Sequence, residues 1–120
     1  VLLTGFKDNP LDYIAASDVY LSTSRWEGLP YSLIEASMMG LPIVATNVVG
    51  NNEVVQNGLN GKLFHSADLK TAVNDILEIC LNKNLSESYG ANAKKFYKSN
   101  FSVDKMITQM HQIYASFIEN

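Results

Sequence analysis

The sequence predicts an α/β protein with a doubly wound, mostly parallel sheet. Short apolar runs that favour buried strands occur at residues 1–4, 19–22 and 43–46. Segments with the start and stop residues of helices separate these runs. Strands that alternate with helices at this spacing are typical of parallel sheets. A chain of 120 residues makes one domain at most.

The N-terminal segment is predicted to contribute the first strand and the first helix. The apolar run 1–4 is expected to be a buried strand that ends at Gly5. Asn9 is a favoured N-cap residue and Pro10 suits the first helical position, which predicts a helix to about Ser17.

The second and third strands are predicted at residues 19–22 and 43–46. In a parallel, doubly wound sheet, ligands bind beyond the carboxyl ends of the strands. We therefore expect three loops to meet at that edge: residues 5–7, 23–30 and 47–53.

A helix is predicted between the second and third strands. Pro30 suits its first position and Gly40 suits the left-handed residue just past its end. The residues at core-facing spacing are Ile34, Met38 and Leu41.

Two carboxylates flank the start of this helix, Glu27 in the loop before it and Glu35 in its second turn. The free backbone amides of Tyr31, Ser32 and Leu33 are expected at the positive end of the helix dipole. Together they would form a binding site for an anion. Helical side chains lean toward the N-terminus, so Glu35 could accept hydrogen bonds from a ribose diol whose diphosphate sits at the helix start. The alternative is a surface helix with a solvated Glu35, and spacing alone favours it.

The segment after the third strand is predicted to start another helix, with Glu53 capping its own helix start near Gly50. Residues 57–58 end that helix, residues 60–61 turn, and residues 62–64 form a short final strand.

The last third of the chain is predicted to be helical. Asp68 caps a helix whose apolar face holds Leu69, Ala72, Val73, Ile76, Leu77 and Cys80. A second helix over residues 85–97 is expected to be weakened by Gly90. Ser102 caps the last helix, which carries an apolar stripe of Val103, Met106, Ile107, Met110, Ile113, Tyr114 and Phe117.

Composition excludes several classes of function. The net charge of −3 and the low pI of about 5.2 do not predict a nucleic-acid partner. Cys80 is the single cysteine, which excludes an internal disulfide, favours a buried structural thiol and suits a reducing, cytoplasmic compartment. His65 and His111 lack zinc-ligand spacing, so no metal and no other cofactor is expected. The sequence shows no apolar run of membrane-spanning length and no signal peptide. It starts inside an apolar run and without Met, and this start suggests a fragment of a longer protein.

The stretch from Glu27-Gly28-Leu29-Pro30 to Glu35-Ala36, followed by Gly40-Leu41-Pro42, resembles the Glu-x7-Glu motif of retaining group-one (family 4) glycosyltransferases. The resemblance extends over nearly the whole chain in family order. It implies a GT-B fold, of which this chain would be a fragment of the C-terminal, Rossmann-like donor domain.

The resemblance also implies roles for the residues of the motif. Glu35 would contact the ribose hydroxyls of a nucleotide-diphosphate sugar. Glu27 would contact the donor sugar and stabilise positive charge at its anomeric carbon. The departing diphosphate would be held, without a metal, by the backbone of Gly28, Leu29, Pro30, Tyr31, Ser32 and Leu33. Phe6 or Lys7 could border the base, and Trp26 could be a sugar platform or a packing residue.

Some family features are missing. Val49 and Asn52 replace a glycine and a proline that the family places before Glu53. The upstream Arg and Lys pair and the acceptor-binding domain are absent from residues 1–120. We therefore expect a truncated donor-binding domain that is inactive alone, within an enzyme of polysaccharide biosynthesis in the cytoplasm or at the inner face of the membrane.

Other classes stay open at this point. A GT-B nucleotide-sugar epimerase or hydrolase would share this donor domain, and a non-catalytic doubly wound binding module would share only the sheet. Besides the nucleotide-sugar donor, the expected partners are an unknown acceptor and the missing N-terminal domain. The chain could also associate with itself through an exposed sheet edge or the last helix.

The family order of strands, 3-2-1-4-5-6, makes residues 1–4 the third strand and leaves strands 1 and 2 out of this chain. Two arrangements could close the gap. Residues 1–4 could pair directly with residues 19–22 through a right-handed crossover, or a second copy of the chain could fill the edge. We expect direct pairing.

Overall fold

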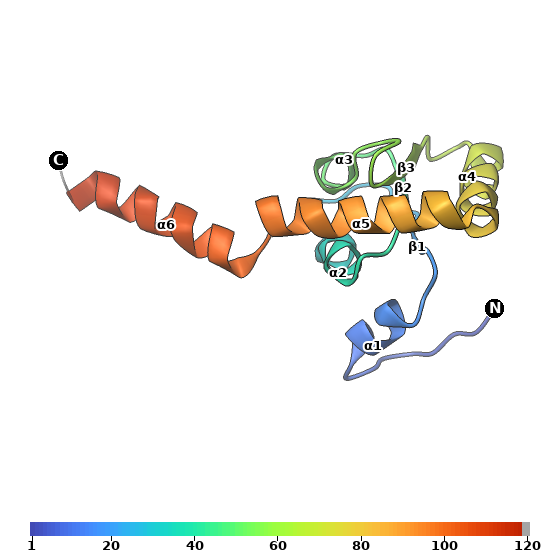
Figure 1. Cartoon of the computed structure of the whole chain (residues 1–120), viewed down its shortest axis with the longest axis horizontal. Helices are drawn as coiled ribbons and strands as arrows, with labels where there is room; N and C mark the ends of the chain where they lie inside the picture. The colour runs from blue at the N-terminus through green and yellow to red at the C-terminus, as the bar shows by residue number, and fades with distance from the viewer. Residues whose placement is uncertain (119–120) are drawn as a thin grey trace.

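The computed structural model describes residues 1–118 and has a parallel three-stranded sheet with helices on both faces (Figure 1). The sheet order is β1 (Tyr20–Ser22), β2 (Ile43–Thr46) and β3 (Gly61–Phe64), with both pairs parallel. The helices are α1 (Pro10–Ala15), α2 (Tyr31–Met39), α3 (Asn51–Val54), α4 (Leu69–Leu81), α5 (Lys83–Asn100) and α6 (Val103–Ile118). The predicted α/β class with a parallel sheet is confirmed.

The central strand β2 is buried on both faces, and its side chains alternate between two cores. Ile43 and Ala45 belong to the core under α1, α2 and α3, together with Ile14, Leu33, Ala36, Leu41, Val54 and Val55. Val44 belongs to the opposite core, with Phe64, Ala72, Ile79 and Tyr89. This burial of both faces is what a doubly wound sheet requires.

The N-terminal segment differs from the prediction. Residues 1–4 form no strand, and direct pairing with β1 is therefore wrong. Val1 and its two leucine neighbours are almost fully exposed. The following helix ends at Ala15, and Asn9 precedes it without a capping hydrogen bond from its side chain. A strand forms only where a neighbour pairs with it, and no strand in the described part of the chain pairs with residues 1–4.

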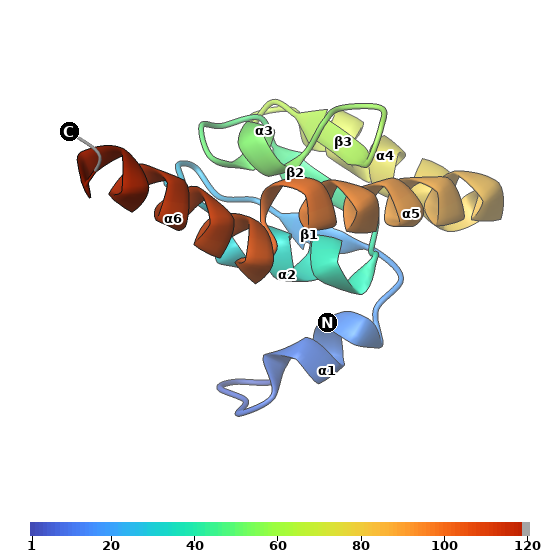
Figure 2. The ribbon, with the colours of Figure 1, turned by 60° about the vertical axis from the view of Figure 1, so that its left-hand side comes forward.

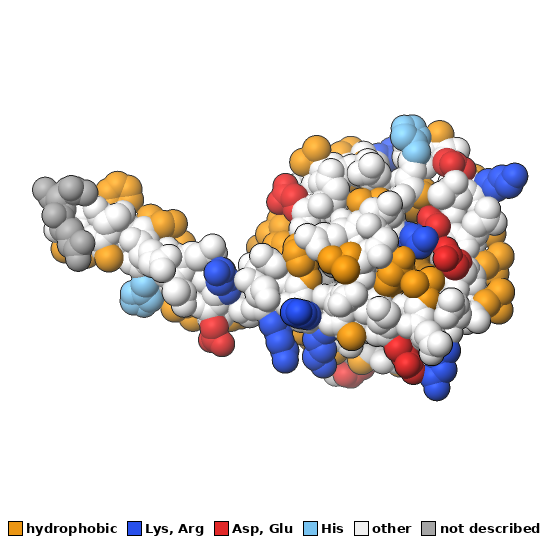
Figure 3. Space-filling model, turned by 45° about the horizontal axis from the view of Figure 1, so that its top comes forward, with side chains coloured by type: hydrophobic (Ala, Val, Ile, Leu, Met, Phe, Trp, Pro, Cys, Tyr) orange, Lys and Arg blue, Asp and Glu red, His pale blue; other side chains and the backbone are white. Residues whose placement is uncertain are grey.

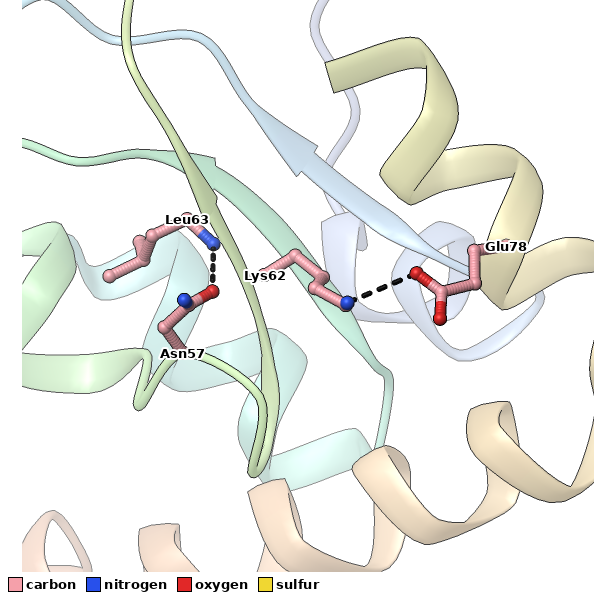
Figure 4. A network of polar contacts seen from close by, with 4 residues as sticks. All are labelled: Asn57, Lys62, Leu63 and Glu78. Carbon is pink, nitrogen blue, oxygen red and sulfur yellow. Dashed lines mark hydrogen bonds and ion pairs between the residues drawn. The ribbon is translucent and has the colours of Figure 1, made fainter. Parts of the chain in front are cut away.

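The two edge strands of the sheet, β1 and β3, differ in whether a side chain covers their outer edge. On β3, the backbone N–H of Leu63 donates to Asn57 Oδ1 at 2.9 Å, so a side chain occupies the place of a strand (Figure 4). On β1, no described residue occupies the outer edge, and Leu21 is half-exposed. Edges that are not covered recruit other strands.

An ion pair joins β3 to α4. Lys62 Nζ lies 3.0 Å from Glu78 Oε2 (Figure 4), and this hydrogen bond raises the pKa of Lys62 against the opposing effect of its burial. The contact fixes α4 against the sheet.

The start and end of α2 follow the prediction closely. Gly40 ends the helix in the left-handed conformation, with φ of 77°, as predicted. Pro30 is the N-cap residue rather than the first helical residue, and its extended φ and ψ start the helix one position later.

The buried face of α2 was predicted only in part, since Leu41 lies in the core as predicted and Ile34 packs against that core. Leu33, Ala36 and Ser37 are buried, whereas Ile34 and Met38 are half-buried. The helix packs against α1 and α5 as well as the sheet, so the small side chains face the crowded side. The buried residues recur at the helical spacing, as predicted. The face that they form is rotated relative to the predicted one, because tertiary packing decides which side of the helix is buried.

α4 and α6 begin where their caps predict, whereas α5 is longer than the predicted 85–97 and begins at Lys83 after an Asn82 cap. Asp68 Oδ1 accepts from Thr71 N at 3.0 Å, and Ser102 Oγ accepts from Lys105 N at 3.3 Å. α5 is continuous through Gly90, and a Cβ at this position would overlap the carbonyl oxygen of Gly40, so the close approach of the end of α2 requires a glycine here.

Two apolar helix faces are uncovered in the described part of the chain. α6 extends away from the sheet (Figures 1 and 2), has no buried residue, and carries its apolar stripe exposed to solvent (Figure 3). This exposure was expected if the partner of α6 is absent. On α4, Leu69, Val73 and Leu77 are exposed, and so is Cys80, so the prediction of a buried thiol is wrong. No described element covers that face of α4.

Candidate functional site

The loops after β1 and β2 come together at the carboxyl edge of the sheet. Thr46, the last residue of β2, donates from Oγ1 to the carbonyl oxygen of Ser24 at 2.5 Å. Ser24 lies in the loop that leads from the carboxyl end of β1 into α2. The predicted convergence of loops 23–30 and 47–53 is confirmed.

The third loop, residues 5–7, does not join them. It borders a shallow cavity beside α1 with Pro10 and Tyr13, and Lys7 Nζ lies 5.9 Å from the centre of the Tyr13 ring. Without a strand at residues 1–4, nothing carries this loop to the sheet edge. The expectation that Phe6 or Lys7 borders a base has no support in this arrangement, and Phe6 is exposed.

Glu27 is held in place by hydroxyl groups. Its Oε1 accepts from Ser24 Oγ at 2.7 Å, and Ser24 Oγ lies 3.3 Å from Ser22 Oγ at the end of β1. The Ser24 proton goes to the carboxylate, so Ser22 is the donor in the second bond. Glu27 is half-buried and keeps its second carboxylate oxygen free of described partners.

The short helix α3 backs this loop. Gly50, its N-cap, has a φ of 89° and lies so close to the loop that a Cβ would overlap the carbonyl oxygen of Gly28. Asn51 Nδ2 donates to Thr46 O at 3.0 Å and to Thr46 Oγ1 at 3.1 Å. Glu53 makes no capping bond and its side chain is exposed, so its predicted role is wrong.

The N-terminus of α2 is open. The backbone N–H groups of Tyr31 and Ser32 have no acceptor among residues 1–118, and the first turn holds no acidic residue. The N–H of Leu33 donates to Pro30 O at 3.0 Å, so it is not free as predicted, and the Leu33 side chain is buried in the core. Proline has no N–H to offer at position 30.

The second carboxylate, Glu35, is partly buried and has no hydrogen-bond or ion-pair partner among the described residues. It lies in the second turn of α2, so the open helix start separates it from Glu27 along the chain. Trp26, beside Glu27, is 83% exposed and therefore does not pack in the described part of the chain. The Glu27 carboxylate is thus held by a hydrogen bond, whereas the Glu35 carboxylate has no described partner and could accept hydrogen bonds from a ligand.

Sequence reasoning missed Ser24, Thr46 and Asn51 as parts of this site. Polar residues at the carboxyl ends of two neighbouring strands were the available signal.

Within residues 1–118, no group of three or more histidine, cysteine or acidic side chains could hold a metal ion. In the same range, no helix has both the length and the apolar character needed to cross a membrane.

A cavity of about 530 Å³ lies elsewhere, between the residues that precede β1 and the adjoining ends of α4 and α5. Its lining includes Asp18, Ile79 and Lys83. It is at the amino end of β1, opposite the edge at which parallel sheets bind ligands. The open start of α2 is the better candidate.

Comparison with known proteins finds relatives whose alignments cover the whole of this chain. A galactosyltransferase of Escherichia coli, UDP-Gal:alpha-D-GlcNAc-diphosphoundecaprenol alpha-1,3-galactosyltransferase, is 28% identical over 120 residues, which are 100% of this chain and 31% of the relative. N-acetyl-alpha-D-glucosaminyl L-malate synthase of Bacillus anthracis is 30% identical over 120 residues, 100% of this chain and 32% of the relative. The chain thus spans about a third of the length of these relatives.

Solved structures share the fold. HepE of Anabaena, determined in complex with UDP and glucose, superimposes with a TM-score of 0.87 and 25% identity over 97% of this chain and 32% of its own. The family described as Glycosyl transferases group 1 matches residues 1–96, which include both strand-end loops and all of α2 and α3. The chain belongs to the group 1 glycosyl transferases, and its sheet and helices are part of a GT-B fold.

Proposed function

We propose that this chain is the donor-binding part of a longer, retaining glycosyltransferase that moves a sugar from a nucleotide-diphosphate sugar to an acceptor. The observation that carries the proposal is the open N-terminus of α2 between one fixed and one uncommitted carboxylate, Glu27 and Glu35. The names of the relatives support it, since one uses UDP-Gal and another was crystallised with UDP and glucose.

The diphosphate would sit at the helix start. Anions bind there because unpaired N–H groups and the helix dipole point at them. In this chain the open donors are the N–H groups of Gly28, Leu29, Tyr31 and Ser32, which have no described acceptor. They would stabilise charge on the departing diphosphate without a metal ion, which is electrostatic stabilisation of a leaving group.

The two carboxylates would act at opposite ends of the donor. Glu35 would accept hydrogen bonds from both ribose hydroxyls, because an ionised carboxylate offers two acceptor oxygens. Glu27 would face the sugar and stabilise positive charge at the anomeric carbon. Its fixed orientation suits that role, since a group that meets charge at one atom gains from being held in place.

The test is a pair of substitutions in the full-length protein, with an exposed acidic residue as control. Glu35→Ala should weaken UDP binding in calorimetry by about ten- to a hundredfold, because hydrogen bonds to a charged acceptor are lost. Glu27→Ala should lower turnover more than UDP affinity. Glu53→Ala, which removes an exposed carboxylate with no described partner, should change neither.

Equal UDP affinity of wild type and the Glu35 variant would contradict the ribose assignment. Product analysis separates the alternatives: turnover of the sugar nucleotide in the absence of any acceptor would indicate a hydrolase or an epimerase instead. Transferase activity of residues 1–120 alone would contradict the proposal that other parts of the protein complete the site.

The uncovered surfaces indicate where those parts would bind. We propose that the rest of the protein, including an N-terminal domain, covers the outer edge of β1, the exposed face of α4 and the stripe of α6. Contiguous exposed apolar faces commonly mark interaction surfaces. A second copy of the chain is the competing occupant, and concentration-dependent sedimentation of the full-length protein would reveal it.

A further inference from the structure

We propose that Ser24 and Thr46 are positioning residues for Glu27, and that Asn51 fixes Thr46. The proposal rests on the proposed role of Glu27. A chain of hydrogen bonds runs from the buried Asn51 through Thr46 to the loop, and from Ser24 to the carboxylate. None of these three polar residues touches the open helix start itself, so their effect on the reaction would pass through Glu27.

The donors and acceptors of this chain are consistent in direction. Asn51 Nδ2 donates to both oxygens of Thr46, so Thr46 Oγ1 accepts there and uses its one proton for Ser24 O. Ser24 then spends its own proton on Glu27 Oε1. Each hydroxyl has one role as donor, and reversing any bond would leave two acceptors facing each other.

Burial shows that the network is costly to keep. Thr46 is 1% exposed and Asn51 is fully buried, and Asn51 Oδ1 has no partner among the described residues. An apolar residue would fill the same space without an unsatisfied oxygen. The amide is therefore explained by what its Nδ2 holds, which is the end of β2 against the Glu27 loop.

The backbone adds a second constraint on the same loop. An added Cβ at Gly50 would lie 3.0 Å from both Cβ and the carbonyl oxygen of Glu27, so α3 is in direct contact with the residue being positioned. The hydrogen bond from Thr46 to the Ser24 backbone, the bond from Ser24 to the carboxylate and the close approach of Gly50 thus all restrict Glu27.

The experiment compares variants of the full-length protein by kcat, by KM for the sugar nucleotide and by the Kd of UDP. Ser24→Ala should lower kcat by about ten- to a hundredfold, the range for one hydrogen bond to a charged group. Thr46→Val should lower it by about three- to tenfold, the range for a neutral bond. In both variants the Kd of UDP should stay within about twofold of wild type, because the helix start is intact.

Conservative variants and one exposed serine supply the controls. Ser24→Thr and Thr46→Ser keep the hydroxyl and should recover most of the lost kcat, whereas a purely packing role would not distinguish them from the apolar variants. Ser66→Ala removes an exposed hydroxyl far along the chain and should leave kcat unchanged. Retained UDP affinity also shows that each variant is folded.

The decisive measurement repeats Ser24→Ala in a Glu27→Ala background, using a single-turnover assay. If Ser24 acts through Glu27, the second substitution should lower the rate no further. An equal loss in both backgrounds, or an unchanged kcat in Ser24→Ala and Thr46→Val, would overturn the positioning role. An unchanged kcat in Glu27→Ala would instead overturn the proposed function. Ser24 is only half-buried, so its variant remains informative if Thr46→Val fails to fold.

Discussion

Replacing Gly50 with alanine should damage both stability and turnover. Two costs add at this position. A φ of 89° with a ψ of −55° lies outside the regions that residues with a Cβ normally populate, and holding such a residue there costs about 1–3 kcal/mol. The new Cβ would also overlap the carbonyl oxygen of Gly28, and overpacking of this kind costs about 1–3 kcal/mol. Together they predict a loss of about 2–6 kcal/mol in the free energy of unfolding.

Gly58 is a matched control for this prediction. Its φ of 79° is similar, but nothing lies within 4 Å of an added Cβ, so Gly58→Ala should cost only the conformational part. Thermal unfolding of both full-length variants isolates the steric part, which should lower Tm further in Gly50→Ala. For a domain of about 150–250 residues, each kcal/mol corresponds to about 2–4 °C.

Turnover separates the two variants as well. Gly50→Ala pushes on the Glu27 loop and should lower kcat, whereas Gly58→Ala should not. Equal losses of Tm in the two variants, with equal kcat, would refute the close contact between α3 and the Glu27 loop.

Three other substitutions test the framework of the site. Leu33→Ala empties a fully buried position and should lower the free energy of unfolding by about 2–5 kcal/mol, measured by urea denaturation. Asn60→Ala should cost about 1–3 kcal/mol in the same assay, because Gln56 N and Val54 O lose their buried partner. The hydrogen bonds from Thr71 lower the pKa of Asp68, so this cap stabilises the fold above the unfolded pKa and is lost as pH falls through the folded pKa. Asp68→Asn keeps the acceptor without titrating, and acid denaturation should show a weaker pH dependence of stability in this variant.

Elements whose signals are local were predicted well. β2 is a continuous apolar run that is buried on both faces, and Gly40, Asp68 and Ser102 mark helix ends through the conformation or side chain of one residue. These features depend on a few neighbours in sequence. Tertiary packing had little opportunity to alter them.

Elements that need a distant partner were predicted poorly. Residues 1–4 have the composition of a strand, but composition supplies no neighbour to pair with. The apolar face of α4 predicted burial of Cys80, and no described element covers it. Similarly, the amide of Leu33 was expected to be free because the exact first residue of α2 could not be fixed from the pattern.

The candidate site divides in the same way. The two carboxylates and the helix start between them lie within one short stretch, so spacing and family resemblance could both find them. The groups that hold Glu27 lie only partly in this stretch: Ser24 is three residues before Glu27, but Thr46 is 22 residues from Ser24 and meets it only because β1 and β2 are adjacent, parallel strands. A linear motif can specify which groups meet a ligand, but the precision of their placement comes from the sheet beneath them.

This division explains why the two carboxylates differ although both belong to one motif. Glu35 lies on a helix, whose backbone already limits where its side chain can reach, and it has no described side-chain partner. Glu27 lies in a loop, where the backbone alone would leave it loose by more than a reacting group tolerates. The hydroxyl of Ser24 and the close approach of Gly50 supply the missing restriction. Thr46, Gly50 and Asn51 therefore belong to the same functional unit as the motif, and substitutions of these three residues should act on turnover before they act on nucleotide binding.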